Sequence, residues 1–156
     1  MAIRHQLIGR DLAAVWTVLS NPARYADWVV GTQDSAPGSG DWPEVGSTLT
    51  YTLALPGRRR ADGHTVVRRF EPPRHLELEA HNPLGSARIA LDIRPWGDQT
   101  LVIVDEHPLR GAAGALHNTL VDALLQLRHR RMLPRLAAVV EHEHPLLHPG
   151  PGRART

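Results

Sequence analysis

Residues 87–106 read ARIALDIRPWGDQTLVIVDE and carry the pattern that decides the fold. In the first half, Ala87, Ile89, Leu91 and Ile93 alternate with mainly charged side chains up to Pro95. A period of two residues is typical of a strand with one buried and one exposed face. The second half, 100–106, is apolar on both faces and predicts another strand.

Short runs of the same kind precede this segment and are separated by turn signals. The clearest, residues 47–55, places Leu49, Tyr51 and Leu53 on one face and threonines on the other. The segment 34–46 is rich in Gly, Pro and Ser and is expected to be a loop. With one more strand near the N-terminus, the sequence predicts seven strands, at residues 3–8, 29–33, 47–55, 64–70, 76–81, 87–94 and 100–106.

Two short helices are expected between the first two strands. Leu12, Val15 and Leu19 have the spacing of one helix face, and Asp11 before them is a good N-cap. Trp16 lies on the same stripe and is expected to be in the core. The pair Asn21-Pro22 predicts a second helix, because Asn caps well and Pro fits the first helical position.

A long helix is predicted from after Gly111 to about residue 143, because leucines recur along it with helical spacing. Pro134 lies inside this segment and is expected to kink the helix. Strands grouped together without intervening helices indicate an antiparallel α+β domain. The long helix has one apolar stripe, and we expect it to be buried on the concave face of the sheet.

The composition limits what the chain can do. The 156 residues suit one domain, expected at 1–144, with a disordered tail at 145–156. The chain has no Cys, which excludes disulfides and thiol catalysis, and no Lys, which excludes Schiff-base catalysis. The formal net charge of +2 is a poor footprint for nucleic acid. No apolar run is long enough to span a membrane and no signal peptide is recognisable, so a cytoplasmic location is expected.

The order of elements and several local signatures resemble the START-like superfamily, also called SRPBCC, and within it the polyketide cyclase/dehydrase and lipid-transport branch. The resemblance covers about residues 3–143. The matching segments are Val15-Trp16, Asn21-Pro22 to Trp28, Val45-Gly46, residues 70–76, Ile93-Arg94-Pro95 with Gly97 and Thr100, and residues 133–141. The resemblance implies an α+β helix-grip fold, in which a seven-stranded antiparallel curved sheet wraps around a long C-terminal helix. It also implies an internal pocket for lipids, polyketides or similar compounds.

Strand alternation and the family pattern together predict the lining of this pocket. Trp28 falls where aromatase/cyclase members have a residue at the pocket mouth, although ordinary core packing explains it equally well. Tyr51 would bring a hydroxyl that needs a partner into an apolar cavity. The predicted ligand-binding residues are Trp28, Leu49, Tyr51, Leu53, Val67, Arg69, Leu78, Leu91, Val104, Glu106, Leu116, Leu120 and Leu124.

Arg69 and Glu106 are the charged members of this set. A charge inside the cavity must be paired or shift its pKa, so each is a candidate for orienting a ligand or for acid–base chemistry. The alternative is that a bulge reverses the register and exposes both side chains, because a slip of one residue exchanges the faces.

The histidines do not form a metal-binding pattern. Asp105, Glu106 and His107 are consecutive and cannot all point to one side of a strand. His142 and His144 lack the helical spacing of a shared ligand face, and no HExxH motif is present. We therefore expect no metal and no cofactor. Arg58–Arg60 and the arginines of the long helix are interpreted as solvated surfaces, with an acidic partner such as an acyl-carrier protein as the alternative.

The sequence therefore predicts binding of a small hydrophobic molecule in a cavity that the 34–46 loop and the start of the long helix close. The alternative is a polyketide aromatase/cyclase that uses Arg69, Tyr51 and Glu106 as catalytic groups for cyclisation or dehydration. A third class is a protein that acts through its surface, as a heterodimer partner or a stress-response module. The sequence leaves open whether the chain is a monomer or a homodimer.

Overall fold

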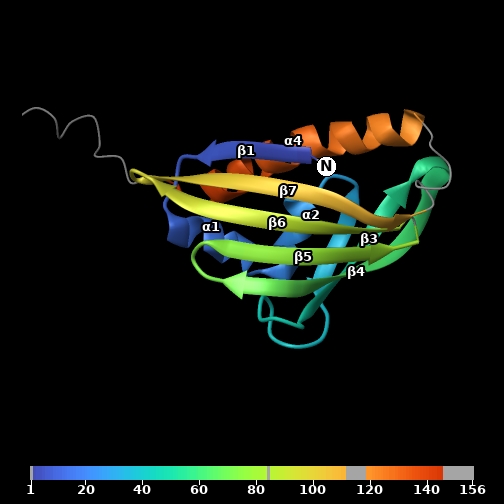
Figure 1. Cartoon of the computed structure of the whole chain (residues 1–156), viewed down its shortest axis with the longest axis horizontal. Helices are drawn as coiled ribbons and strands as arrows, with labels where there is room; N and C mark the ends of the chain where they lie inside the picture. The colour runs from blue at the N-terminus through green and yellow to red at the C-terminus, as the bar shows by residue number, and fades with distance from the viewer. Residues whose placement is uncertain (1, 84, 112–118, 146–156) are drawn as a thin grey trace, which may run out of the picture.

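Seven strands and three α-helices build the fold, which a computed structural model describes for residues 2–83, 85–111 and 119–145 (Figure 1). The strands are β1 (Ala2–Ile8), β2 (Thr32–Pro37), β3 (Thr48–Leu55), β4 (Arg59–Glu71), β5 (His75–Asn82), β6 (Gly85–Trp96) and β7 (Gln99–Gly111). The α-helices are α1 (Leu12–Leu19), α2 (Tyr25–Trp28) and α4 (Thr119–Glu143), and 3₁₀ turns η1 (Pro22–Arg24) and η2 (Pro56–Arg58) precede α2 and β4.

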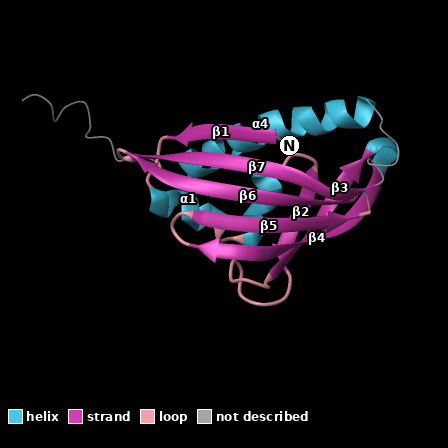
Figure 2. Cartoon of the chain, viewed as in Figure 1, coloured by secondary structure: helices cyan, strands magenta, loops and turns pink. Residues whose placement is uncertain are grey.

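All strands belong to one antiparallel sheet in the order β1-β7-β6-β5-β4-β3-β2. The sheet is curved, and the helices lie on its concave side, with α4 alongside β1 (Figure 2). This is the helix-grip architecture that the sequence predicts.

The two short helices begin where the sequence indicates. The Asp11 side chain accepts a hydrogen bond from the amide of Ala14, at 3.0 Å, and thereby caps α1. Asn21 caps η1 by accepting from the amide of Ala23, with Pro22 at the first helical position. Both caps supply partners for amides that have none inside the helix.

The core consists of the inward side chains of the sheet packed against α1 and α4. Val15, Val18 and Leu19 of α1 are fully buried, as are Leu136 and Val140 of α4. Burial of these apolar side chains is the main favourable contribution to folding. The core thus fills most of the space between the sheet and the helices.

Several strand boundaries differ from the prediction, including those of β2 and β4. β2 begins at Thr32 instead of Val29, because the amide of Val29 closes the last turn of α2 by donating to the carbonyl of Tyr25. β2 also continues to Pro37, inside the predicted loop, through pairing with β3. β4 begins at Arg59 because its register with β3 continues to the η2 turn. Cross-strand pairing extends strands into segments that have no alternating pattern of their own.

The α4 helix continues through Pro134, which lies on its exposed side. The Met132, Leu133 and Leu136 side chains next to it are buried. Burial of this stripe favours helix on both sides of the proline, despite the hydrogen bond that proline cannot donate. Within the described part of the chain, no helix is long and apolar enough to span a membrane. The predicted tail falls, from residue 146 onwards, outside the described residues.

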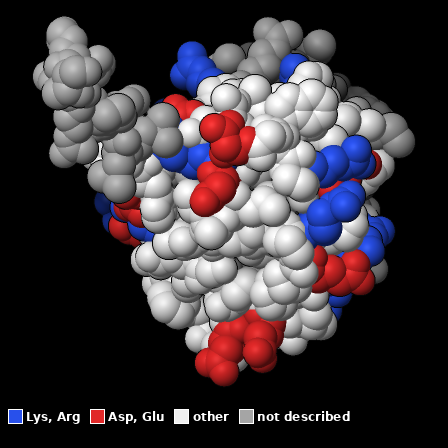
Figure 3. Space-filling model, turned by 90° about the vertical axis from the view of Figure 1, so that its left-hand side faces the viewer, with Lys and Arg blue, Asp and Glu red and all other residues white. Residues whose placement is uncertain are grey.

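The end of the molecule at which α1 lies carries separate groups of acidic and basic side chains with uncharged surface between them (Figure 3). On the outer face of the sheet, Arg68 pairs with Glu79 at 3.0 Å and Arg94 pairs with Asp92 at 2.7 Å. The hydrogen bond from Arg94 lowers the pKa of Asp92, and that from Arg68 lowers the pKa of Glu79. The outer face of the sheet is therefore polar, with ion pairs between its side chains, whereas the concave face carries the apolar core.

Candidate functional site

A cavity lies on the concave face of the sheet, beneath α2 and the Met132 turn of α4. Its volume is about 40 Å³, measured as the space open to the centres of water-sized molecules, and a single water needs roughly 10–15 Å³ of such space. The lining is mainly apolar. The described residues that line it are Tyr25, Trp28, Val29, Thr32, Leu49, Tyr51, Thr65, Leu78, Ala80, Ile89, Glu106 and Met132.

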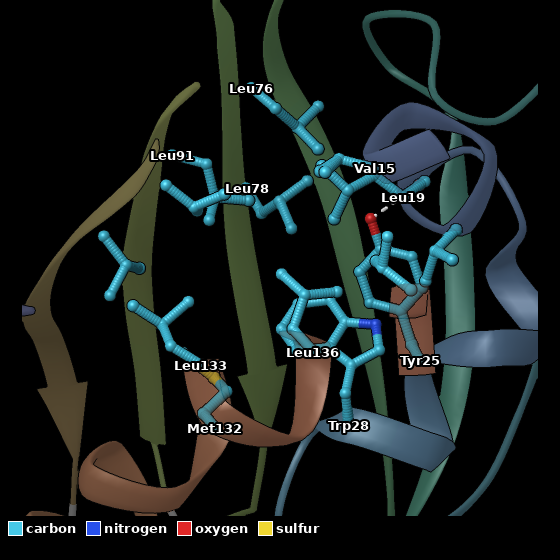
Figure 4. Packing of buried hydrophobic residues seen from close by; sticks show 14 of the residues in the cluster. Val15, Leu19, Tyr25, Trp28, Leu76, Leu78, Leu91, Met132, Leu133 and Leu136 are labelled. Atoms are coloured by element: carbon cyan, nitrogen blue, oxygen red, sulfur yellow. Dashed lines mark hydrogen bonds between the residues drawn. The ribbon is translucent and has the colours of Figure 1, made fainter. Parts of the chain in front are cut away.

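Aromatic side chains from α2 form one wall of the cavity. The ring of Trp28 packs against that of Tyr25 with centroids 4.9 Å apart, and Trp42 meets Tyr25 edge-on at 5.3 Å (Figure 4 shows Tyr25 and Trp28). Trp28 is only 2% exposed, and its indole Nε1 has no hydrogen-bond partner among the described residues. The ring faces offer apolar contact along this wall, and the indole N–H is a donor still able to bond to an acceptor.

Two of these aromatic residues anchor the wall to α1. The Tyr25 hydroxyl and the Trp42 Nε1 both donate to the carbonyl oxygen of Leu19, at 2.8 and 3.0 Å. Burial raises the pKa of Tyr25 well above its ordinary value. Tyr25 is thus a structural group, held neutral in the core.

Tyr51 crosses the concave face from β3 towards β5. Its hydroxyl donates to the carbonyl of His81, at 3.3 Å, and accepts from the Nδ2 of Asn82, at 3.0 Å. The ring passes over Gly63 on β4, where an added Cβ would lie 2.4 Å from the ring Cζ. The absence of a side chain at Gly63 therefore allows the Tyr51 hydroxyl to reach β5.

Glu106 contributes the carboxylate of the cavity. It belongs to the inward row of β7 with Val102 and Val104, and it lies opposite Ile89 of β6. On the other side, Arg4 of β1 pairs with Val104, so Arg4 and Glu106 are diagonal neighbours on the same face. This positive neighbour lowers the free-energy cost of holding a carboxylate here.

The expectation that Arg69 faces the cavity is wrong. The pairing of β4 with β5 shifts between Val67 and Arg69, which is the β-bulge that the alternative interpretation considered. The Arg69 side chain is 46% exposed and pairs on the outer face with Glu71, at 2.5 Å, and with Glu77, at 3.9 Å. The bulge turns Phe70 inward, where it packs against Trp16. Burying Phe70 and exposing Arg69 costs less free energy than the reverse.

The other predicted lining residues divide into three groups. Trp28, Leu49, Tyr51, Leu78 and Glu106 line the cavity. Four others face inward but are buried in the hydrophobic core and do not line the cavity: Leu53, Val67, Leu91 and Val104. Leu116 lies outside the described residues, and so do the side chains of Leu120 and Leu124.

Several lining residues were not predicted. Strand alternation could have found Thr65, Ala80 and Ile89, since each lies two residues from a predicted inward position. Met132 and Thr32 had no such signal, because their places depend on how α4 and the start of β2 pack. Helical spacing connects Tyr25 to Trp28, three residues further on.

The expectation that the 34–46 loop closes the cavity is also wrong for the described lining, which contains no residue of this segment. The loop instead packs behind the aromatic wall, through Trp42. Its Gly46 amide donates to the carbonyl of Val67 at 2.9 Å, which ties the loop to β4. Residues 112–118, where the other closing segment was expected, are outside the described residues.

Among the described residues, no group of three or more His, Asp or Glu side chains is arranged to hold a metal ion. The contacts of His81 with Glu79, at 2.9 Å, and of His107 with Asp105, at 3.1 Å, lie on the outer face of the sheet. The described lining residues of the cavity offer hydroxyls, the Glu106 carboxylate, the indole N–H of Trp28 and aromatic rings.

The comparisons with known proteins agree with this geometry. The family model described as polyketide cyclase / dehydrase and lipid transport matches residues 4–141. The chain therefore belongs to this family, within the START-like (SRPBCC) superfamily. No curated protein sequence matches the chain.

Solved structures with a similar fold come from several sources. A conserved protein from Geobacillus kaustophilus is 14% identical with a TM-score of 0.73, over 91% of this chain and 95% of that one. The Zhui aromatase/cyclase from Streptomyces sp. R1128 is 13% identical with a TM-score of 0.73, over 91% and 93%. Ara h 8.0201 is 9% identical with a TM-score of 0.68, over 90% and 97%. At these identities the similarity establishes the fold alone.

Proposed function

We propose that this protein binds a small, largely apolar molecule in the cavity between the sheet and the helices. The observation that carries the proposal is unfilled space in the core, lined by Trp28, Leu49, Leu78, Ile89 and Met132. Concave, mainly apolar cavities with a few polar groups are the usual form of small-molecule sites. Membership of a family whose description includes lipid transport supports the same function.

The cavity must widen to hold an organic ligand, because its volume is below the roughly 300–1,000 Å³ of typical pockets. Met132 is the most adaptable side chain of the lining, since an unbranched thioether changes rotamer at low cost. We expect ligand binding to move Met132 and to leave the β-sheet side of the cavity in place.

The test uses the neutral fluorescent probe N-phenyl-1-naphthylamine, whose emission rises in apolar surroundings. The wild-type protein should bind it saturably. Ala80→Leu places extra volume in the cavity and should weaken binding at least about tenfold. Ala90→Leu is the matched control, because Ala90 is a similarly half-buried residue on the neighbouring strand but faces outward.

Circular dichroism and thermal unfolding establish that both variants are folded. Absence of saturable binding by the wild-type protein would contradict the proposal. Equal affinity in Ala80→Leu and Ala90→Leu would place the probe somewhere other than this cavity and would also contradict it.

A polyketide aromatase/cyclase is the second candidate function, and the observation that favours it is that Tyr51 and Glu106 line one cavity. Arg69 is no longer a candidate for this chemistry, because its side chain lies on the opposite face of the sheet. Under this alternative, Tyr51→Phe changes the product distribution from a reactive polyketide chain without unfolding the protein. Unchanged products from Tyr51→Phe would contradict the aromatase/cyclase alternative. Docking of an acyl-carrier protein at Arg58–Arg60 stays a prediction.

A further inference from the structure

The polar groups of the cavity differ in what they can offer a ligand. Besides Tyr25, whose hydroxyl is bonded to the Leu19 carbonyl, and the indole N–H of Trp28, the polar residues of the described lining are Thr32, Tyr51, Thr65 and Glu106. Threonine hydroxyls both donate and accept hydrogen bonds, so they suit many ligand groups. The selectivity of the cavity therefore depends on Tyr51 and Glu106.

Tyr51 has one hydroxyl proton and two lone pairs. The proton is donated to the His81 carbonyl, and one lone pair accepts from the Asn82 amide. Donating to a ligand would require breaking the bond to His81 and leaving that carbonyl without its donor. Tyr51 is therefore poorly placed to donate to a ligand, and any capacity that remains is as an acceptor.

Glu106 also serves as a hydrogen-bond acceptor. An ionised carboxylate only accepts hydrogen bonds, and its two oxygens have room for about four of them. It can therefore accept from a ligand in addition to the protein groups around it. A second negative charge beside this carboxylate would be disfavoured, because the two charges repel in a site partly shielded from water.

We propose that the cavity selects neutral apolar molecules that carry a hydroxyl group, such as alcohols, phenols or enols, and rejects carboxylates. The ligand hydroxyl donates to Glu106, and its apolar body packs against Trp28 and the aliphatic lining. This inference rests on the proposed binding function and specifies the chemical class of the ligand. It excludes free fatty acids as preferred ligands, although their chains would suit the lining.

Three naphthalenes of the same ring size test the inference: 2-naphthol, 2-methoxynaphthalene and 2-naphthoate, each titrated into the wild-type protein at pH 7 by calorimetry. The hydroxyl compound should bind about tenfold or more tightly than the methyl ether, which cannot donate. The affinity for 2-naphthol should also exceed that for 2-naphthoate by at least the same factor. Equal affinity of the alcohol and the ether overturns the inference, and so does binding of the carboxylate as tightly as the alcohol.

Glu106→Gln gives a second test on the same ligands. Glutamine keeps the size and an acceptor oxygen but removes the charge and adds a donor, so 2-naphthoate should gain at least about fivefold in affinity. Glu44→Gln, which removes a carboxylate from the exposed loop, is the control and should change nothing. No gain for 2-naphthoate in a folded Glu106→Gln variant contradicts the role given to Glu106.

The outcome also separates this inference from the binding function itself. If N-phenyl-1-naphthylamine binds but the alcohol has no advantage, the selectivity is wrong and the binding function stands. If neither the probe nor any of the three naphthalenes binds, both are overturned.

Discussion

Gly63 lies directly beneath the ring of Tyr51, and this contact sets how far the tyrosine hydroxyl extends across the sheet. An added Cβ would lie 2.4 Å from the ring Cζ and 2.6 Å from the hydroxyl oxygen, both far inside van der Waals contact. Glycine normally weakens a strand. Glycine at position 63, in the middle of β4, therefore leaves the space that the Tyr51 ring occupies.

We predict that Gly63→Ala destabilises the protein by about 1–3 kcal/mol, because the ring must move and lose its bonds to His81 and Asn82. Urea unfolding measures the change. In a Tyr51→Val background the obstacle is absent, and the same substitution should be neutral or stabilising, since alanine suits a strand better than glycine. An equal cost in both backgrounds would show that the contact with Tyr51 is not the cause.

The carbonyl of Leu19 is a second residue-scale feature, because it accepts from both Tyr25 and Trp42. Loss of one donor leaves the other in place. Tyr25→Phe should therefore cost only about 0.5–1.5 kcal/mol at neutral pH.

The pH dependence of stability should identify Tyr25 directly. Its ordinary pKa is 10.0 and burial raises it in the folded state. Above pH 10 the unfolded chain therefore releases a proton that the folded chain retains, and stability falls as pH rises. The loss is about 1.4 kcal/mol per pH unit for one group. The chain has no lysine to titrate in the same range.

We predict that the free energies of unfolding of wild type and Tyr25→Phe converge between pH 9 and pH 11. Urea unfolding at each pH measures the difference. Parallel curves over this range would mean that Tyr25 has an ordinary pKa in the folded protein.

At the scale of elements, the C-terminal end of α4 is attached to the β1–α1 connection. The Arg10 guanidinium donates to the carbonyls of Glu141, at 3.0 Å, and His144, and the Gly9 amide donates to the Glu141 carboxylate at 2.9 Å. Cations at the end of a helix satisfy its last carbonyls and interact favourably with its dipole. Arg24 of η1 adds an ion pair to Glu143.

Arg10→Met should lower the free energy of unfolding by about 1–2 kcal/mol, because methionine keeps the aliphatic stem but removes the donors. Amide hydrogen exchange in the last turns of α4 should become faster. Arg60→Met, at an exposed position in β4, is the control and should stay within about 0.5 kcal/mol of wild type. If exchange in α4 is unchanged, Arg10 does not hold this end of the helix.

The bulge in β4 shows how one element distributes its side chains between the two faces. Without it, strict alternation after Val67 would bury Arg69 and expose Phe70. With it, Phe70 packs on Trp16 and Arg69 pairs with Glu71 on the outer face. A charged side chain and an aromatic one in adjacent positions thus decide the local register.

At the scale of the whole molecule, the curved sheet separates two chemical environments. Its convex face carries ion pairs between neighbouring strands, such as Arg68 with Glu79 and Arg88 with Glu77. Its concave face carries the apolar core and the cavity, where the carboxylate of Glu106 is the exception. Among the described lining residues Glu106 is the single charged one, and this is the reason that we expect the cavity to distinguish ligands by their polar group.

The sequence by itself determined the order of strands and helices, the seven-stranded antiparallel sheet and the inward positions of most strands. Leu49, Tyr51, Leu78 and Glu106 were placed correctly because alternation is a local property of an extended chain. The apolar stripe of the long helix placed it on the concave face, the family resemblance implied the same, and the structure confirms it.

Only the tertiary structure decided where the unfilled space lies and which inward residues reach it. Val67 and Leu91 face inward as predicted, yet both are buried in the packed core and do not line the cavity. Arg69 faces outward because the packing of Phe70 against Trp16 favours a bulge that alternation cannot reveal. A cavity is the volume that several elements together leave empty, so its lining depends on long-range packing and not on any local pattern.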